Sequence, residues 1–149
     1  MYEDLKEIID NTSVLQQGGV GDVDEQWIIE AEAKLGLPFP PSYRWWLTNY
    51  GSGFLDGQPI YTLAPPEFRD TADSDIVTAN ETNRNNGLTE DGRLYFFEPD
   101  GDERFFFDML THDNDGDNPV MVEDLAEQEI REYGGNFAYF LRNEIEMRN

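Results

Sequence analysis

Cysteine is absent from this 149-residue chain, and histidine occurs once, at His112. Without cysteine there is no disulfide framework, no thiol nucleophile and no cysteine-ligated zinc. The adjacent pair His112 and Asp113 resembles a fragment of a metal-dependent hydrolase site, but such sites gather several histidines or carboxylates around the metal. We therefore expect no catalytic residue, no metal and no cofactor.

Basic residues are also scarce. Ten lysines and arginines stand against 32 aspartates and glutamates, which gives a net charge of −22. Phosphate backbones are bound by lysine and arginine, so this composition argues against direct binding to DNA or RNA. The acids are dispersed along the chain, and two interpretations stay open. The charge serves solubility alone, or it accelerates the encounter with a partner that has a strongly basic surface.

Long apolar runs are missing as well. The first ten residues, M-Y-E-D-L-K-E-I-I-D, are acidic and resemble neither a secretory signal nor a membrane anchor. We expect a cytoplasmic protein with no membrane partner. The length predicts a single domain over residues 1–149, able to bury roughly 70% of its unfolded surface. Hydrophobic residues make up 38% of the chain, with 10 Phe, 7 Tyr and 3 Trp, which suffices for an aromatic core.

Residues 24–36 are predicted to form an amphipathic helix. Asp24 is the expected N-cap, and Gly36 can supply the left-handed residue that ends the helix. Helical spacing places one apolar stripe on Ile28, Ala31 and Leu35. An extended corner that cannot continue the helix follows at Pro38, Pro40 and Pro41.

A second helix is predicted to begin with Ser42 as its cap and to close at Gly51. The spacing i, i+3, i+4 and i+7 gives this helix one aromatic face, formed by Tyr43, Trp46, Leu47 and Tyr50. Trp45 lies off that face. It is either an exposed anchor for a partner or packed partly under a neighbouring loop.

Further helices are expected over residues 2–11, 71–86 and 136–148, and strands over residues 60–63, 93–98, 103–109 and 118–122. The stretch P-D-G-D at 99–102 is a predicted hairpin turn between the two aromatic strands. Those strands place large residues on both faces, so helices or a second layer should cover both, and Phe106 should either line a cleft or lie beneath a helix. The prediction is an α+β domain in which helices pack a small, mainly antiparallel sheet.

Several segments carry a family resemblance. A helix ending L-G, followed by L-P-x-P-x-S-Y and by a W-L helix ending Y-G-x-G, resembles the opening of the SUKH superfamily. The name refers to yeast Smi- and Knr-type regulators of cell-wall assembly and their bacterial relatives. The stretch D-G-D-N-P-V-M-V at 115–122 is similar to the acidic turn, proline and strand of that family, and F-x-x-F-L at 137–141 resembles its last helix. The resemblance covers most of the chain and implies a SUKH-like fold.

The acidic stretch also superficially matches a calcium loop. Asp113, Asp115 and Asp117 fall at ligand positions 1, 3 and 5. Position 6 should be glycine and is Asn118, while position 12 should be glutamate and is Asp124. We interpret the stretch as an acidic hairpin turn.

Three classes of function compete. Many bacterial SUKH relatives are immunity proteins that bind and neutralise a toxin domain, often a nuclease, so the resemblance implies a non-enzymatic protein with a cognate toxin as partner. The acidity agrees independently, because a nuclease presents a basic substrate groove. The alternative is a regulatory or scaffold domain of the cell-wall-assembly type, and the third class, an enzyme, has no supporting constellation. We expect a monomer or a weak homodimer.

Candidate partner contacts follow from charge and expected exposure, not from any family motif. Trp45 is the candidate apolar anchor. The candidate acidic contacts lie on predicted loops and turns: Asp56, Glu67, Asp70, Asp73, Asp75, Asp100, Asp102, Asp113, Asp115 and Asp117.

Overall fold

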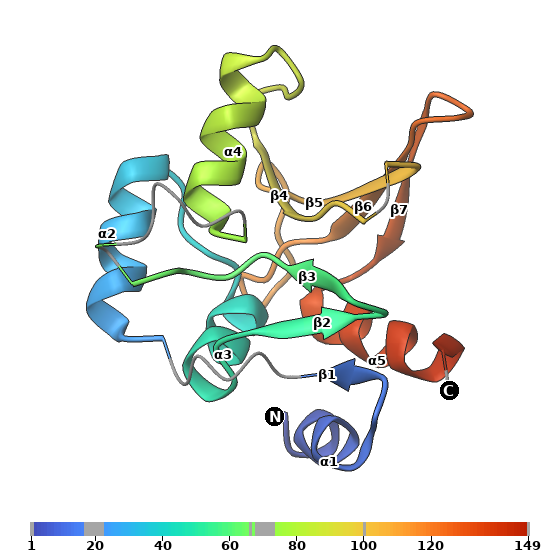
Figure 1. Ribbon diagram of the computed structural model, residues 1–149. Helices are drawn as coiled ribbons and strands as arrows, with labels where there is room; N and C mark the ends of the chain where they lie inside the picture. The colour runs from blue at the N-terminus through green and yellow to red at the C-terminus, as the bar shows by residue number, and fades with distance from the viewer. Residues whose placement is uncertain (1, 17–22, 66, 68–73, 100, 149) are drawn as a thin grey trace.

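Antiparallel strands form two sheets in the computed structural model, which describes residues 2–16, 23–65, 67, 74–99 and 101–148. In chain order the elements are α1 (Glu3–Asn11), β1 (Leu15–Gln16), α2 (Glu25–Leu35), α3 (Pro41–Asn49), β2 (Gly53–Leu55), β3 (Gln58–Ile60), α4 (Ile76–Asn85), β4 (Arg93–Phe97), β5 (Glu103–Asp108), β6 (Val120–Asp124), β7 (Glu129–Gly134) and α5 (Phe137–Arg148). The smaller sheet has the order β1-β2-β3, and the larger one has the order β4-β5-β6-β7 (Figure 1). The predicted α+β class is confirmed, with the strands divided between two sheets.

Helix α2 forms as its sequence predicts. The Asp24 carboxylate accepts a hydrogen bond of 2.9 Å from the backbone N–H of Gln26, which satisfies one of the free donors at the start of the helix. Gly36 ends the helix with φ 71°, a left-handed conformation that glycine adopts without steric cost. The predicted apolar stripe is buried: Ile28, Ala31 and Leu35.

Helix α3 begins differently from the prediction. Pro41 occupies its first position, and Pro40, which precedes the helix, makes no side-chain cap bond. Proline suits the first position because its missing N–H would lack a helical partner anyway. The backbone N–H of Ser42, inside the first turn, donates to the Asp117 carboxylate at 3.4 Å. The role predicted for Ser42 is therefore wrong, and its buried hydroxyl is free to bond elsewhere. The predicted aromatic face is correct in its first three members, since Tyr43, Trp46 and Leu47 are all buried.

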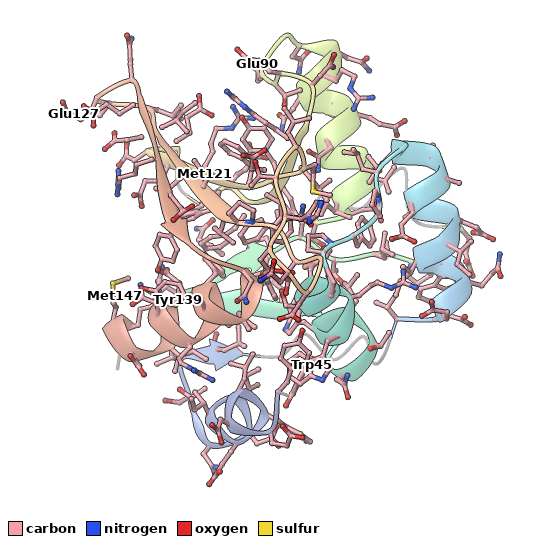
Figure 2. All side chains as sticks on the ribbon, turned by 180° about the vertical axis from the view of Figure 1, so that it is seen from behind. Trp45, Glu90, Met121, Glu127, Tyr139 and Met147 are labelled. Carbon is pink, nitrogen blue, oxygen red and sulfur yellow. The ribbon has the colours of Figure 1, made fainter. Side chains whose placement is uncertain are left out.

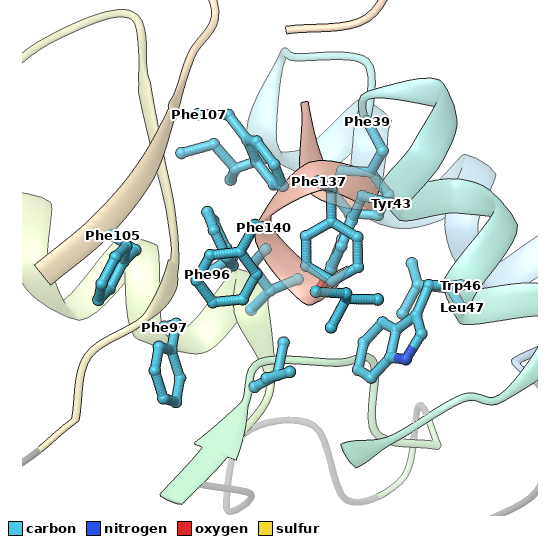
Figure 3. Close-up of a cluster of buried hydrophobic side chains, with 14 of the residues drawn as sticks. Phe39, Tyr43, Trp46, Leu47, Phe96, Phe97, Phe105, Phe107, Phe137 and Phe140 are labelled. Carbon is cyan, nitrogen blue, oxygen red and sulfur yellow. The ribbon is translucent and has the colours of Figure 1, made fainter. Parts of the chain in front are cut away.

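The core lies between the larger sheet and helices α3 and α5 (Figure 3). Phe96 and Phe107 stack on neighbouring strands with ring centroids 4.3 Å apart. Phe96 meets Phe140 of α5 edge-on at 4.9 Å, and Tyr43 of α3 meets Phe137 of α5 edge-on at 5.2 Å. One aromatic cluster thus fixes both helices against one face of the sheet.

The other face of the larger sheet is covered by arginine. The Arg93 guanidinium lies 4.9 Å from the Phe106 ring centroid, and that of Arg104 lies 3.9 Å from the Tyr95 ring centroid. Both rings are buried in this way. Phe106 is predicted either to line a cleft or to be buried beneath a helix. It is buried, but the group that covers it is the Arg93 guanidinium and not a helix.

Helix α4 lies beside β4 rather than over the sheet (Figure 1). The buried Asn80 side chain donates to the Tyr95 carbonyl oxygen at 2.8 Å and accepts from the Tyr95 N–H at 2.9 Å. It therefore satisfies the backbone of Tyr95 as a neighbouring strand would. Residues 71–73 of the predicted helix lie outside the described part of the chain.

The strand predictions are partly wrong. Strands β1, β2 and β7 are not predicted from the sequence. The strand predicted over residues 60–63 shares only Ile60 with β3, so its bounds are wrong, and the one predicted over 118–122 overlaps β6 from Val120 on. The hairpin between β4 and β5 is confirmed, with Gly101 at φ 88°.

Candidate interaction surfaces

Ser42 and Asp117 connect three parts of the fold. The Ser42 hydroxyl donates to the Asp117 carboxylate at 3.0 Å and accepts from the backbone N–H of Phe137 at 3.2 Å. The acidic turn is thereby attached to the first turns of α3 and α5. Asp117 is 4% exposed, so the exposure predicted for it is wrong. Burial raises the pKa of Asp117, while the hydrogen bonds from Ser42 act in the opposite direction.

The residues ahead of Asp117 form the predicted acidic turn. One carboxylate oxygen of Asp113 accepts from the backbone N–H groups of Asp115 and Asp117, each at 2.9 Å. Asp113 and Asp115 are exposed. Within the described ranges, no group of three or more His, Asp or Glu side chains is arranged to hold a metal ion.

A cleft of about 310 Å³ lies beside this turn, which we call the Tyr2 cleft. Its walls include Tyr2 and Tyr139 together with the three aspartates of the turn, Asp113, Asp115 and Asp117. Burial raises the pKa of the Tyr2 hydroxyl, and the negative charges of these aspartates raise it further. The cleft therefore has an aromatic wall and is lined by three acids against one base, Arg142.

Trp45 lies against the same tyrosine. Its ring centroid is 4.8 Å from that of Tyr2 and 5.8 Å from that of Tyr50, and the side chain stays partly exposed (Figure 2). Its cover comes from two aromatic rings rather than from a loop. Through Tyr2 the structure brings Trp45 close to the acidic turn, so four of the candidate contact residues gather in one region.

Asp75 is not a surface residue, contrary to the prediction. It is fully buried, and its two carboxylate oxygens accept from the backbone N–H groups of Ala64 and Thr78, each at 3.0 Å. This residue caps the N-terminus of α4, so its side chain serves the fold.

The other predicted acids that the structure describes do not line the Tyr2 cleft. Glu67 and Asp102 are exposed, and Asp56 is exposed while forming an ion pair with Arg148. Three candidates lie outside the described residues: Asp70, Asp73 and Asp100.

The sequence patterns do not predict a second hollow, on the arginine-covered face of the larger sheet. We call it the outer hollow; it has a volume of about 240 Å³ and is lined by Glu90, Asp91, Gly92, Arg93, Phe106, Asp108, Leu110, Met121 and Ile130. Its position follows from strand pairing, because Phe106 pairs with Met121 across β5 and β6. The alternation along β5 was the available signal, since it places Arg104, Phe106 and Asp108 on one face.

No helix in the described ranges has the length and apolar character needed to cross a membrane. The fold and surface thus define a small α+β domain with acid-lined hollows. The family model SUKH_6, described as SMI1-KNR4 cell-wall, matches residues 25–141. The chain therefore belongs to this SUKH family, and the resemblance in its sequence is confirmed. No curated protein matches the chain.

Proposed function

We propose that this protein is a non-enzymatic immunity protein that binds and neutralises a basic toxin domain of the nuclease type. The observation that carries the proposal is the net charge of −22, together with acids lining both the Tyr2 cleft and the outer hollow. Membership of the SUKH family supports the same class. The proposed site of action is the cytoplasm.

Neutralisation needs no catalytic group. A nuclease holds its substrate in a basic groove, and an acidic protein that covers the groove, or sits beside it, excludes the phosphate backbone. The same charges steer the encounter, because complementary potentials raise association rates far above those of neutral pairs. The partly exposed aromatic Trp45 beside the acidic turn supports a contact that combines charge with apolar burial.

A regulatory or scaffold role is the second candidate. It is supported by the description of the matching family, which names the cell wall. In this role the acidic hollows would bind a component of wall assembly, and the protein would protect no cell from a toxin.

Co-expression tests the proposal. The chain is expressed with the polypeptide encoded directly upstream of it, and growth and co-purification are measured. We expect the upstream polypeptide alone to arrest growth, and the wild-type chain to restore growth while co-purifying with it. A stable complex with a non-toxic protein of wall synthesis would instead favour the scaffold role.

A further inference from the structure

We propose that the outer hollow is the partner-binding surface, and that it accepts an apolar side chain flanked by lysines or arginines of a basic protein. This inference rests on the proposed function and assigns its contact surface. Three observations carry it: an apolar centre on an open sheet face, an acidic rim, and a net charge that opposes pairing with a second copy.

The centre of the hollow is apolar and partly open. Phe106 forms the floor, and Met121 and Ile130 stand on the neighbouring strands β6 and β7. Ile130 is 44% exposed and Leu110 is 81% exposed. A group of apolar side chains on an open sheet face is the kind of surface that partners cover.

The fold holds Leu110 in place without burying it. A Cβ atom added to Gly92 would lie 2.6 Å from the Leu110 Cγ atom, so the leucine packs directly on bare backbone. The Leu110 N–H donates to the Asp108 carboxylate at 3.0 Å. An exposed leucine that is oriented by these two contacts is pre-organised for a partner.

The rim is acidic. Glu90, Asp91 and Asp108 line the hollow against one arginine, Arg93. Arg93 is occupied by its ion pair with Glu90 at 3.1 Å and by its position over Phe106. An arriving lysine or arginine therefore meets carboxylates at the rim, while an apolar neighbour meets the exposed side chains of Leu110 and Ile130.

The charge also identifies the kind of partner. A second copy of this chain would bring another −22 and the same acidic rim, and like charges across an interface oppose association. A basic protein has the complementary sign. The occupant that fits is thus a cationic partner with an apolar anchor, rather than another copy.

Methionine methyl groups provide a local readout. The chain has four methionines, and Met121 lines the outer hollow while Met147 lies on α5, 62% exposed and away from it (Figure 2). In protein labelled with ¹³C-methyl methionine, a twelve-residue peptide of alternating leucine and lysine is titrated. We expect a saturable shift of the Met121 methyl signal, with Met147 unchanged. Peptides with serine for leucine, or glutamate for lysine, should bind at least tenfold more weakly.

Paired variants separate local contact from total charge. Asp91→Lys and Glu146→Lys change the net charge equally, and both residues are exposed. Asp91→Lys should weaken peptide binding about tenfold, and Glu146→Lys less than twofold. Leu110→Ser should weaken peptide binding by a similar factor. Met147→Ser is its control, and neither change should prevent folding because both side chains are exposed.

The surface assignment is contradicted if the peptide does not bind, if Met147 shifts with Met121, or if the two charge variants behave alike. A Met121 shift that grows with protein concentration and without peptide would identify a second copy as the occupant and also overturn it. Failure of the proposed function is distinguishable, because wild-type protein would then fail to restore growth whatever the peptide titration gives. If wild type restores growth, the Asp91→Lys variant should do so less well than Glu146→Lys.

Discussion

At the scale of single residues, buried polar groups decide how the acidic turn is attached. Asp117 was expected to face a partner, yet its carboxylate is buried against the Ser42 hydroxyl. A buried carboxylate is retained where donors compensate for the water it has lost. Its role is therefore to hold the turn so that Asp113 and Asp115 stay exposed.

The raised pKa of Asp117 predicts a pH dependence of stability. Because burial raises the folded-state pKa above its ordinary value of 3.8, the folded state favours the protonated carboxyl. The contribution of this carboxyl to the free energy of unfolding is then greatest at pH values below the ordinary pKa. It falls as the pH rises from the ordinary pKa through the raised, folded-state pKa. Relative to Asp117→Asn, wild type should lose stability over that window. Denaturant titrations of both proteins at several pH values measure this difference. If the stability of wild type relative to Asp117→Asn instead grows with pH, the Ser42 hydrogen bonds dominate over burial.

Trp45 and Trp46 are neighbours in the chain, but their substitution by alanine should lower stability by different amounts. Trp46 is fully buried, with its ring centroid 5.5 Å from that of Phe137, whereas Trp45 is partly exposed. Trp46→Ala should lower the free energy of unfolding by about 3–5 kcal/mol. Trp45→Ala should cost clearly less. Urea titration of both variants compares them, and a larger cost for Trp45 would contradict the assigned helix face.

At the scale of elements, local signals are predictable and long-range pairings are not. The cap and stop of α2 act within a few residues, so Asp24 and Gly36 are identified correctly from the sequence. Ser42 misleads because the helix begins one residue earlier, at Pro41, so that Ser42 lies inside the first turn and its N–H donates to the distant Asp117 carboxylate. Strand β7, with the sequence E-I-R-E-Y-G, lacks apolar alternation and forms because β6 offers it a pairing edge.

The candidate surfaces depend on contacts between distant residues. Ser42 and Asp117 are 75 positions apart, and no periodicity brings Trp45 near the acidic turn. The composition predicts an acidic surface, but which acids lie together on it is decided by how α3, α5 and the turn pack. The outer hollow likewise depends on the register of β5, β6 and β7.

The edge of β4 provides a prediction at this scale. Asn80→Ala should leave the N–H and carbonyl of Tyr95 without their side-chain partners. Unpaired buried groups of this kind cost about 1–3 kcal/mol each. We expect a loss of stability in this range and faster hydrogen exchange at the Tyr95 amide. Asn85→Ala, at an exposed position of the same helix, is the control and should change neither quantity.

At the scale of the whole molecule, charge dominates. A net −22 over 149 residues works against compactness through self-repulsion, and the aromatic core opposes this effect. The acids are dispersed along the chain, so in the proposed function their field would act at long range and guide the encounter with a basic partner. We propose that local geometry in the Tyr2 cleft and the outer hollow then determines which partner stays bound.

The salt dependence of association tests the central claim most directly. In stopped-flow mixing with the toxin domain identified by growth rescue, the association rate constant should approach about 10⁸–10⁹ M⁻¹s⁻¹ at low salt, against roughly 10⁵–10⁶ M⁻¹s⁻¹ for an unsteered pair. Raising ionic strength from about 0.01 to 0.15 M shortens the Debye length from roughly 30 to 8 Å. The account predicts a steep fall in the association rate constant and little change in dissociation. An association rate that is independent of salt would contradict it and would mean that the acidity serves solubility alone.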